Sequence, residues 1–154
     1  ADFVLDTTQM PSAKLRGKLY ELFSETGQRG RMGVNVVSFG YKYGIPLEAD
    51  LVFDVRFMPN PFYVPELRPK TGMDDEVYNY VFSFPQAKEF LTRLEDMLAF
   101  LLPLYQEEGK AMLVIAVGCT GGRHRSVSIA RAVTEYLGKL GYAAFENHRD
   151  ITRG

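Results

Sequence analysis

The amino-acid sequence predicts an α/β sandwich built around a mainly parallel sheet. Short runs of apolar and β-branched residues alternate along the chain with longer segments in which apolar residues recur at helical spacing. One short run, residues 111–117, contains only apolar residues, which is typical of a strand that is covered on both faces. Because alternating strands and helices bring each strand back in the same direction, we expect the strands to be mainly parallel.

Each element is predicted from its own apolar pattern and its boundary residues. Strands are expected at residues 3–5, 33–39, 51–56, 111–117 and 143–148. Helices are expected at residues 10–27 and 85–108, and from the glycine-rich loop after residue 117 as far as Gly141. Gly27, Gly109 and Gly141 follow the last helical residues, where glycine commonly terminates a helix. Residues 57–84 contain four prolines and are expected to form a long irregular segment that covers a site or faces another subunit.

Composition limits the classes of protein that this chain can represent. Its 154 residues suit one domain, and 46% hydrophobic with 24% charged residues indicates a folded rather than a disordered chain. A formal net charge of −1 argues against a whole basic face for nucleic acid or membrane, so polyanion binding needs a local cluster. The single cysteine, Cys119, excludes an internal disulfide and fits a reducing cytoplasm. Two histidines and one cysteine are too few for a convincing zinc site, so no metal is expected.

The glycine-rich loop between the buried strand and the next helix is the main candidate for ligand binding. Glycines let the backbone approach a ligand closely, and a helix N-terminus presents N–H groups to an anion. Arginine adds a fork of donors that can grip two phosphate oxygens. The alternative is a tight turn whose arginines are merely solvated. The candidate phosphate-binding residues of the loop are Gly118, Cys119, Thr120, Gly121, Gly122, Arg123, His124, Arg125 and Ser126.

Polar residues also follow the other predicted strands. Ligands of open parallel sheets bind beyond the carboxyl ends of the strands, so these residues are expected at the same edge as the loop. Asp54 and Arg56 lie two residues apart on one strand and therefore share a face, as ligand contacts or as a structural ion pair.

Three further basic residues are tentative RNA contacts. Lys42 stands between two tyrosines, and charge combined with stacking suits single-stranded RNA, although a solvated loop lysine fits equally well. His148 and Arg149 follow the last strand and are either RNA contacts or a frayed end. Arg68 and Lys70 are further candidates for anion contacts.

The loop also allows a catalytic alternative. Cys119, five intervening residues, Arg125 and Ser126 reproduce the spacing by which tyrosine-phosphatase-type enzymes place a thiolate under a phosphate. Those enzymes commonly have histidine directly before the cysteine, where this chain has Gly118. A Walker A spacing is absent from the sequence.

These motifs resemble the C-terminal half of the RapZ/YvcJ family of bacterial RNase adapters and nucleotide-binding proteins. Residues 1–8 resemble the join between the two halves, and the chain begins with Ala1 instead of methionine, so we expect a fragment of a longer protein. Residues 1–154 would then be one domain, with residues 1–10 as the join. The other matching stretches are residues 38–46, 49–61, 67–72 and 118–126.

The resemblance implies a phosphofructokinase-like α/β fold and a sensing and RNA-binding role in a cytoplasmic, homo-oligomeric protein. Enterobacterial members bind glucosamine-6-phosphate and small regulatory RNAs, and present the RNA to an endoribonuclease. Carried over, Thr120, Gly121 and Arg125 would contact the sugar phosphate, and Lys42 would contact RNA. ATP or GTP would bind only to the N-terminal half, so no cofactor is expected in this domain.

Two positions depart from the enterobacterial pattern. Phe62 stands where those members have a histidine tied to ligand binding, and residues 150–154 replace a basic tail. The hypothesis is therefore a non-catalytic domain that senses a phosphorylated amino sugar or nucleotide-sugar and does not contact membrane. RNA binding as the primary role and a cysteine-dependent phosphatase are the alternatives.

Overall fold

The computed structural model of the chain describes residues 32–153. The predicted helix at residues 10–27, the strand at 3–5 and the join at 1–10 lie outside the described residues. The strands are β1 (Gly33–Gly40), β2 (Leu51–Asp54), β3 (Met112–Cys119) and β4 (Ala143–His148). The α-helices are α2 (Asp75–Phe82), α3 (Pro85–Glu107) and α4 (Arg125–Lys139), and the 3-10 helices are η2 (Tyr41–Tyr43) and η3 (Pro61–Tyr63).

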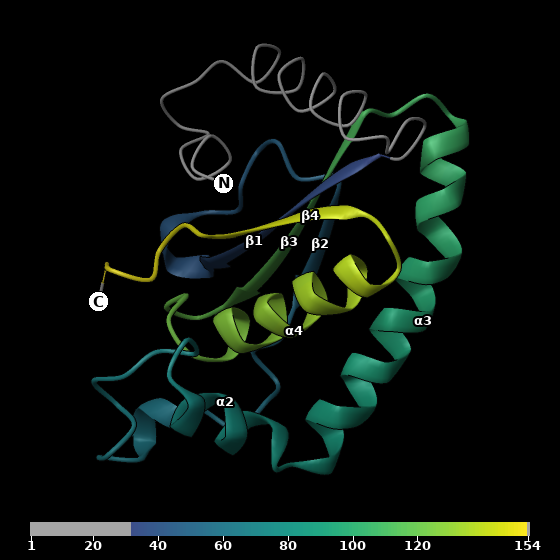
Figure 1. The fold of residues 1–154 in the computed structure, drawn as a ribbon. Coiled ribbons are helices and arrows are strands. Elements are labelled where there is room, and N and C mark those ends of the chain that lie inside the picture. The colour runs from purple at the N-terminus through teal and green to yellow at the C-terminus, as the bar shows by residue number, and fades with distance from the viewer. Residues whose placement is uncertain (1–31, 154) are drawn as a thin grey trace.

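The four strands form one parallel sheet in the order β2-β3-β1-β4 (Figure 1), which confirms the predicted α/β class and strand direction. β1 and β3 occupy its centre, and the wholly apolar run at residues 111–117 lies in β3. The register places Gly40 beside Cys119 and Asp54 beside Gly118, while Ser38 lies beside His148. The carboxyl ends of all four strands therefore lie along one edge of the sheet.

The hydrophobic core lies between the sheet and the helices. α4 packs against β1, β3 and β4, and both α2 and α3 contact α4. Every residue of β1 and β3 is buried. Each fully buried aliphatic side chain contributes about 1.5–3 kcal/mol, so this core holds the sheet edge and its loops in place. The large buried residues include Phe39 of β1, Leu98 and Leu102 of α3, Leu113 and Ile115 of β3, and Ile129 and Leu137 of α4.

The ends of the helices follow the predicted glycine signals. Gly109 and Gly141 follow α3 and α4, and both have a φ of +97°, a conformation that glycine adopts without steric cost. α3 begins at Pro85, whose ring fixes the backbone torsion that the first helical turn needs. No helix among residues 32–153 combines the length and apolar character that crossing a membrane would require.

The prediction that residues 57–84 are irregular is wrong in two places. Asn60 caps the short helix η3 by accepting the Phe62 N–H at 3.1 Å. All four prolines precede Asp75, so α2 can form after them, with Asp75 and Glu76 in its first turn, where acidic groups are favourable. The apolar residues on its buried side are Val77 and Val81, four positions apart.

The second strand ends two residues earlier than predicted. β2 stops at Asp54, and the Asp54 carboxylate accepts the backbone N–H of Arg56 at 2.9 Å. Such an Asx turn offers the backbone an alternative to the ladder and redirects the chain.

Candidate functional site

A cavity of about 270 Å³ opens at the carboxyl edge of the sheet. Its walls come from the turn after β1, from the start of the proline-rich segment and from residues 118–126, which we call the glycine loop. The lining residues are Lys42, Asn60, Phe62, Tyr63, Cys119, Thr120, Gly121, Arg123, His124 and Arg125. The structure therefore brings Lys42, a predicted RNA contact, into the same cavity as most of the predicted phosphate-binding residues.

Arg125, the first residue of α4, is the least solvated of the cations that line this cavity. Only 5% of it is exposed, and its Nη1 donates to the carbonyl oxygens of Arg56 at 2.7 Å and Met58 at 3.0 Å. Its Nε is buried and has no hydrogen-bond partner among the described residues. Within residues 32–153 it forms no ion pair with a carboxylate. A buried charge with an unused donor is costly unless an anion completes it.

The glycine loop is held against the end of β1 by direct backbone contact. Gly122 has a φ of +79°, and a Cβ built on it would lie 2.6 Å from the Gly40 nitrogen and 2.8 Å from the Phe39 carbonyl carbon. A Cβ on Gly40 would in turn lie 2.5 Å from the Gly121 carbonyl carbon. Only glycine fits at Gly40 and Gly122, and this contact fixes the position of the loop relative to the sheet.

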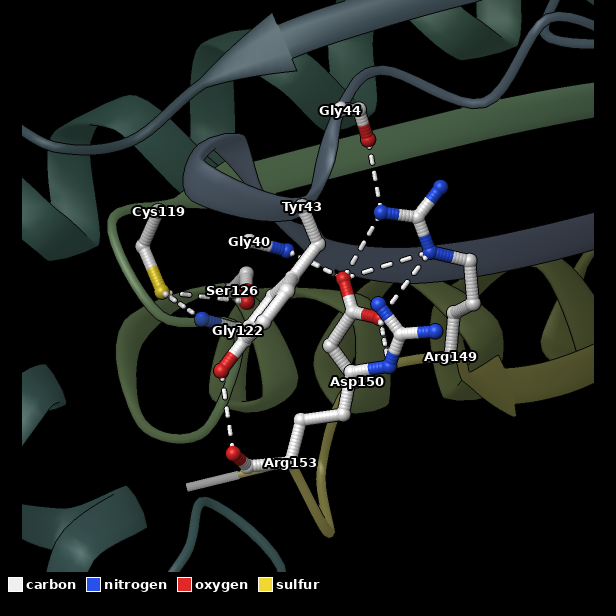
Figure 2. A network of polar contacts seen from close by, with 9 residues as sticks. All are labelled: Gly40, Tyr43, Gly44, Cys119, Gly122, Ser126, Arg149, Asp150 and Arg153. Atoms are coloured by element: carbon white, nitrogen blue, oxygen red, sulfur yellow. Dashed lines mark hydrogen bonds and ion pairs between the residues drawn. The ribbon is translucent and has the colours of Figure 1, made fainter.

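The thiol of Cys119 is tied into the loop itself. It is buried, donates to the hydroxyl of Ser126 at 3.2 Å and accepts the N–H of Gly122 at 3.3 Å (Figure 2). The side chain therefore helps to close the turn that joins β3 to α4, and Ser126 acts as its hydrogen-bond acceptor.

The two other basic residues of the loop differ in charge. His124 is buried, and because its Nε2 faces the carbonyl oxygen of Arg68 at 3.2 Å, this nitrogen must carry the proton and donate it. Burial lowers the pKa of His124, which favours the neutral ring at neutral pH. Arg123 donates to the carbonyls of Pro69 at 3.1 Å and Ile151 at 3.3 Å and thereby links the loop to two distant segments.

Asp54 and Arg56 lie at the same edge but are not among the cavity-lining residues. They form an ion pair with Arg56 Nη2 and Asp54 Oδ2 2.7 Å apart, and both side chains are nearly half exposed. The hydrogen bonds from Arg56 lower the pKa of Asp54. The Arg56 guanidinium also lies 3.9 Å from the centre of the Tyr41 ring. The structure shows the ion pair, and contact of Asp54 or Arg56 with a ligand stays a prediction.

The C-terminal segment 149–153 is anchored through a carboxylate that sequence reasoning missed. Asp150 is fully buried and accepts the N–H of Gly40 at 2.8 Å, and Arg149 and Arg153 form ion pairs with it at 2.8 and 3.5 Å (Figure 2). Arg149 also donates to the Gly44 carbonyl at 2.6 Å. The network holds the end of β1 next to the glycine loop, since a Cβ built on Gly122 would lie only 3.0 Å from the Asp150 Cβ. The signal available in the sequence was an acidic residue placed two positions after the end of a strand.

The tentative RNA contacts His148 and Arg149 are thus engaged within the domain. The ring of His148 lies between the Ser38 hydroxyl, 2.7 Å from Nδ1, and the Glu146 carboxylate, 2.6 Å from Nε2. The carboxylate requires the proton on Nε2, so Nδ1 accepts from Ser38. These bonds anchor the end of β4 and leave no frayed segment at His148 or Arg149.

Sequence reasoning also missed cavity residues in the proline-rich segment. Asn60 and Tyr63 were not singled out, and Phe62 was noted only as a departure from the enterobacterial pattern. The cover predicted for this segment does lie beside the site. Arg68, a candidate anion contact, instead donates to the Phe62 carbonyl at 2.8 Å, and Lys70 forms an ion pair with Glu76.

Fold and site together define a parallel α/β domain with a cationic cavity at the carboxyl edge of its sheet. The model of the RapZ C-terminal domain matches residues 32–152, and the chain belongs to this family. It is 54% identical over 151 residues to a nucleotide-binding protein of Caldanaerobacter subterraneus subsp. tengcongensis, covering 98% of this chain and 53% of that protein.

Two further relatives show similar sequence identity and similar coverage of both chains. A nucleotide-binding protein of Caldicellulosiruptor saccharolyticus is 55% identical over 153 residues, with 99% of this chain and 52% of that protein covered. A nucleotide-binding protein of Bacillus cytotoxicus is 53% identical over 157 residues, with the same coverage of both chains. The chain therefore spans about half the length of the curated relatives that it matches.

Proposed function

We propose that this domain is a non-catalytic sensor that binds a phosphorylated metabolite in the cavity at the sheet edge. The observation that carries the proposal is Arg125, a buried guanidinium with a free Nε donor and no carboxylate partner within residues 32–153. An anionic ligand in the cavity would supply the counter-charge that this guanidinium lacks among the described residues. Hydrogen bonds between charged groups contribute about 1.5–3 kcal/mol, enough to favour such a ligand strongly.

The charges around the cavity fit a phosphate group. Lys42, Arg123 and Arg125 line it as cations, and the N-terminus of α4 adds the partial positive charge of a helix dipole. A phosphate monoester carries about two negative charges near neutral pH. The neutral ring of His124 contributes shape and position rather than charge.

The lining supports binding more than turnover. The Cys119 thiol closes the loop through Ser126 and Gly122, and the ring of His124 is held by the Arg68 carbonyl, so both side chains already have partners within the domain. The phosphatase alternative requires Cys119 as nucleophile. Aryl phosphate hydrolysis that disappears in Cys119→Ser would favour that alternative over the proposed sensor.

Titration calorimetry tests the proposal with a matched pair of compounds. Glucosamine-6-phosphate should bind, and glucosamine, which differs only in the phosphate, should bind at least about thirtyfold more weakly, the equivalent of about 2 kcal/mol. Equal affinity for the two compounds would show that no phosphate site exists. Inorganic phosphate should compete with the sugar phosphate.

RNA binding is a second proposal, favoured by Lys42 beside an aromatic ring. Lys42 lines the cavity, and its Nζ lies 5.3 Å from the centre of the Tyr43 ring. In a plot of log affinity for RNA against log salt concentration, each phosphate contact should contribute about −0.7 to the slope. Lys42→Ala should remove the contribution of about one contact. A gel shift that does not respond to salt would refute it. The endoribonuclease partner and the homo-oligomer remain predictions from the resemblance.

A further inference from the structure

Two adjacent aromatic side chains stand exposed on the wall of the cationic cavity. Phe62 is 47% exposed and Tyr63 is 74% exposed, and both line the cavity together with Lys42, Arg123 and Arg125. Aromatic rings beside cations are the combination that proteins use for nucleotides, since every base has a face that stacks and every nucleotide carries phosphate. Nothing in the sensor proposed above requires these rings.

The Phe62 ring is fixed in position. Its backbone N–H donates to the Asn60 side chain at 3.1 Å, and its carbonyl accepts from Arg68 Nε at 2.8 Å. The Arg68 guanidinium lies 4.6 Å from the ring centre, and the Tyr63 ring meets it edge-on with centroids 5.6 Å apart. A ring held from several sides loses little freedom when a ligand stacks on it, so it is preorganised for binding.

The polar groups of the cavity also discriminate between ligand classes. None of the described residues that line it is acidic, so the ammonium of an amino sugar would find no carboxylate there. The Asn60 side-chain oxygen already accepts the Phe62 N–H. Three lining cations exceed the roughly two charges of one phosphate, and a second phosphate group would balance the third cation.

We propose that the cavity binds a nucleoside diphosphate group, with the diphosphate against Lys42, Arg123 and Arg125 and the base stacked on the Phe62 ring. This inference rests on the proposed phosphate site and adds the base-binding subsite to it. The subsite is built from the short helix η3, whereas the phosphate site is built from the glycine loop. The two can therefore be tested separately.

The test is calorimetry of the 154-residue chain with ADP and with methyl diphosphate, which carries the same diphosphate but no base. ADP should bind about tenfold more tightly, because stacking of one base on an aromatic side chain is typically worth at least that factor. Phe62→Ala should abolish the difference and leave the affinity for methyl diphosphate unchanged, and Phe62→Trp should retain it. The matched control is Phe100→Ala, which removes a 66% exposed ring of α3 outside the cavity and should change neither affinity.

The outcomes separate the two proposals. If methyl diphosphate and ADP bind the wild-type chain equally, the base subsite is wrong while the phosphate site stands. If neither binds, both proposals fail. If glucosamine-6-phosphate binds more tightly than ADP and this preference disappears in Phe62→Ala, the ring recognises a sugar, and the nucleotide assignment is overturned.

Discussion

Replacement of Arg125 by alanine should weaken phosphate binding far more than any other single truncation at the site. The substitution removes the buried guanidinium, including the free Nε donor and the donors now bonded to the carbonyls of Arg56 and Met58. Loss of one hydrogen bond to a charged group, about 2 kcal/mol, corresponds to about thirtyfold in affinity. Arg125→Lys keeps the charge but not the planar fork, so we expect a smaller loss, about five- to tenfold.

The effect on folding can be separated from the effect on binding. At a ligand concentration of about 100 times Kd, the wild-type protein should gain about 2.7 kcal/mol of stability. After a thirtyfold loss the same concentration is only about three times Kd, and the gain should fall to about 0.9 kcal/mol. Urea unfolding with and without phosphate measures this difference directly, whatever the variant loses in the absence of ligand.

The comparison requires a surface control. Arg93→Ala removes an exposed arginine of α3 that pairs with Glu89, and it should preserve both affinity and the ligand-induced gain. An Arg125→Ala variant that binds within threefold of wild type, or that gains as much stability from phosphate, would refute the role assigned to the buried guanidinium.

Three further predictions concern the scaffold. In chemical denaturation, Gly122→Ala should lower the free energy of unfolding by at least about 2 kcal/mol, since its Cβ would clash with the backbone and φ is positive there. Gly138→Ala, which has open space for a Cβ within α4, should raise the free energy of unfolding by roughly 0.5–1 kcal/mol. Asp150→Asn should cost about 2–3 kcal/mol in thermal unfolding because it breaks a buried ion pair, while Asp75→Asn at an exposed pair should cost less than about 1 kcal/mol. Because burial lowers the pKa of His124, the unfolded chain is protonated first as the pH falls below 6.5, so stability should decrease toward acid, and His124→Gln should flatten that dependence.

Each of these can be contradicted. A neutral Gly122→Ala would show that the loop does not depend on backbone contact with β1. If Asp150→Asn and Asp75→Asn lose equal stability, the network around Asp150 stabilises the domain no more than an exposed ion pair does. A pH profile that is identical in wild type and His124→Gln would show that His124 is not held neutral by the fold.

The parts of the fold set by local patterns could be predicted from the sequence. The apolar run at residues 111–117 predicted β3. The glycines after the two long helices predicted where α3 and α4 end. The convergence of strand ends follows from parallel pairing alone. The helix α2 was missed because the prolines before it dominate the composition of residues 57–84, while its own short apolar pattern spans only two buried positions.

The site was predictable in its chemistry but not in its geometry. Glycines and arginines in one loop indicated an anion, and the structure places most of them around one cavity. Which arginine is buried and unpaired depends on the Arg56 and Met58 carbonyls, which reach Arg125 only in the folded chain. The role of Asp150 could not be predicted for the same reason, because its partner Gly40 is 110 residues away in sequence.

The central claim is that a phosphate in the cavity provides the counter-charge of the buried Arg125 guanidinium. The ¹H–¹⁵N signal of its Nε–H in the arginine side-chain region of an NMR spectrum, assigned by its loss in Arg125→Lys, reports on the surroundings of this guanidinium. We predict a downfield proton shift and slower exchange with water as inorganic phosphate is added to saturation. A signal that stays unchanged while phosphate is in excess would contradict the claim.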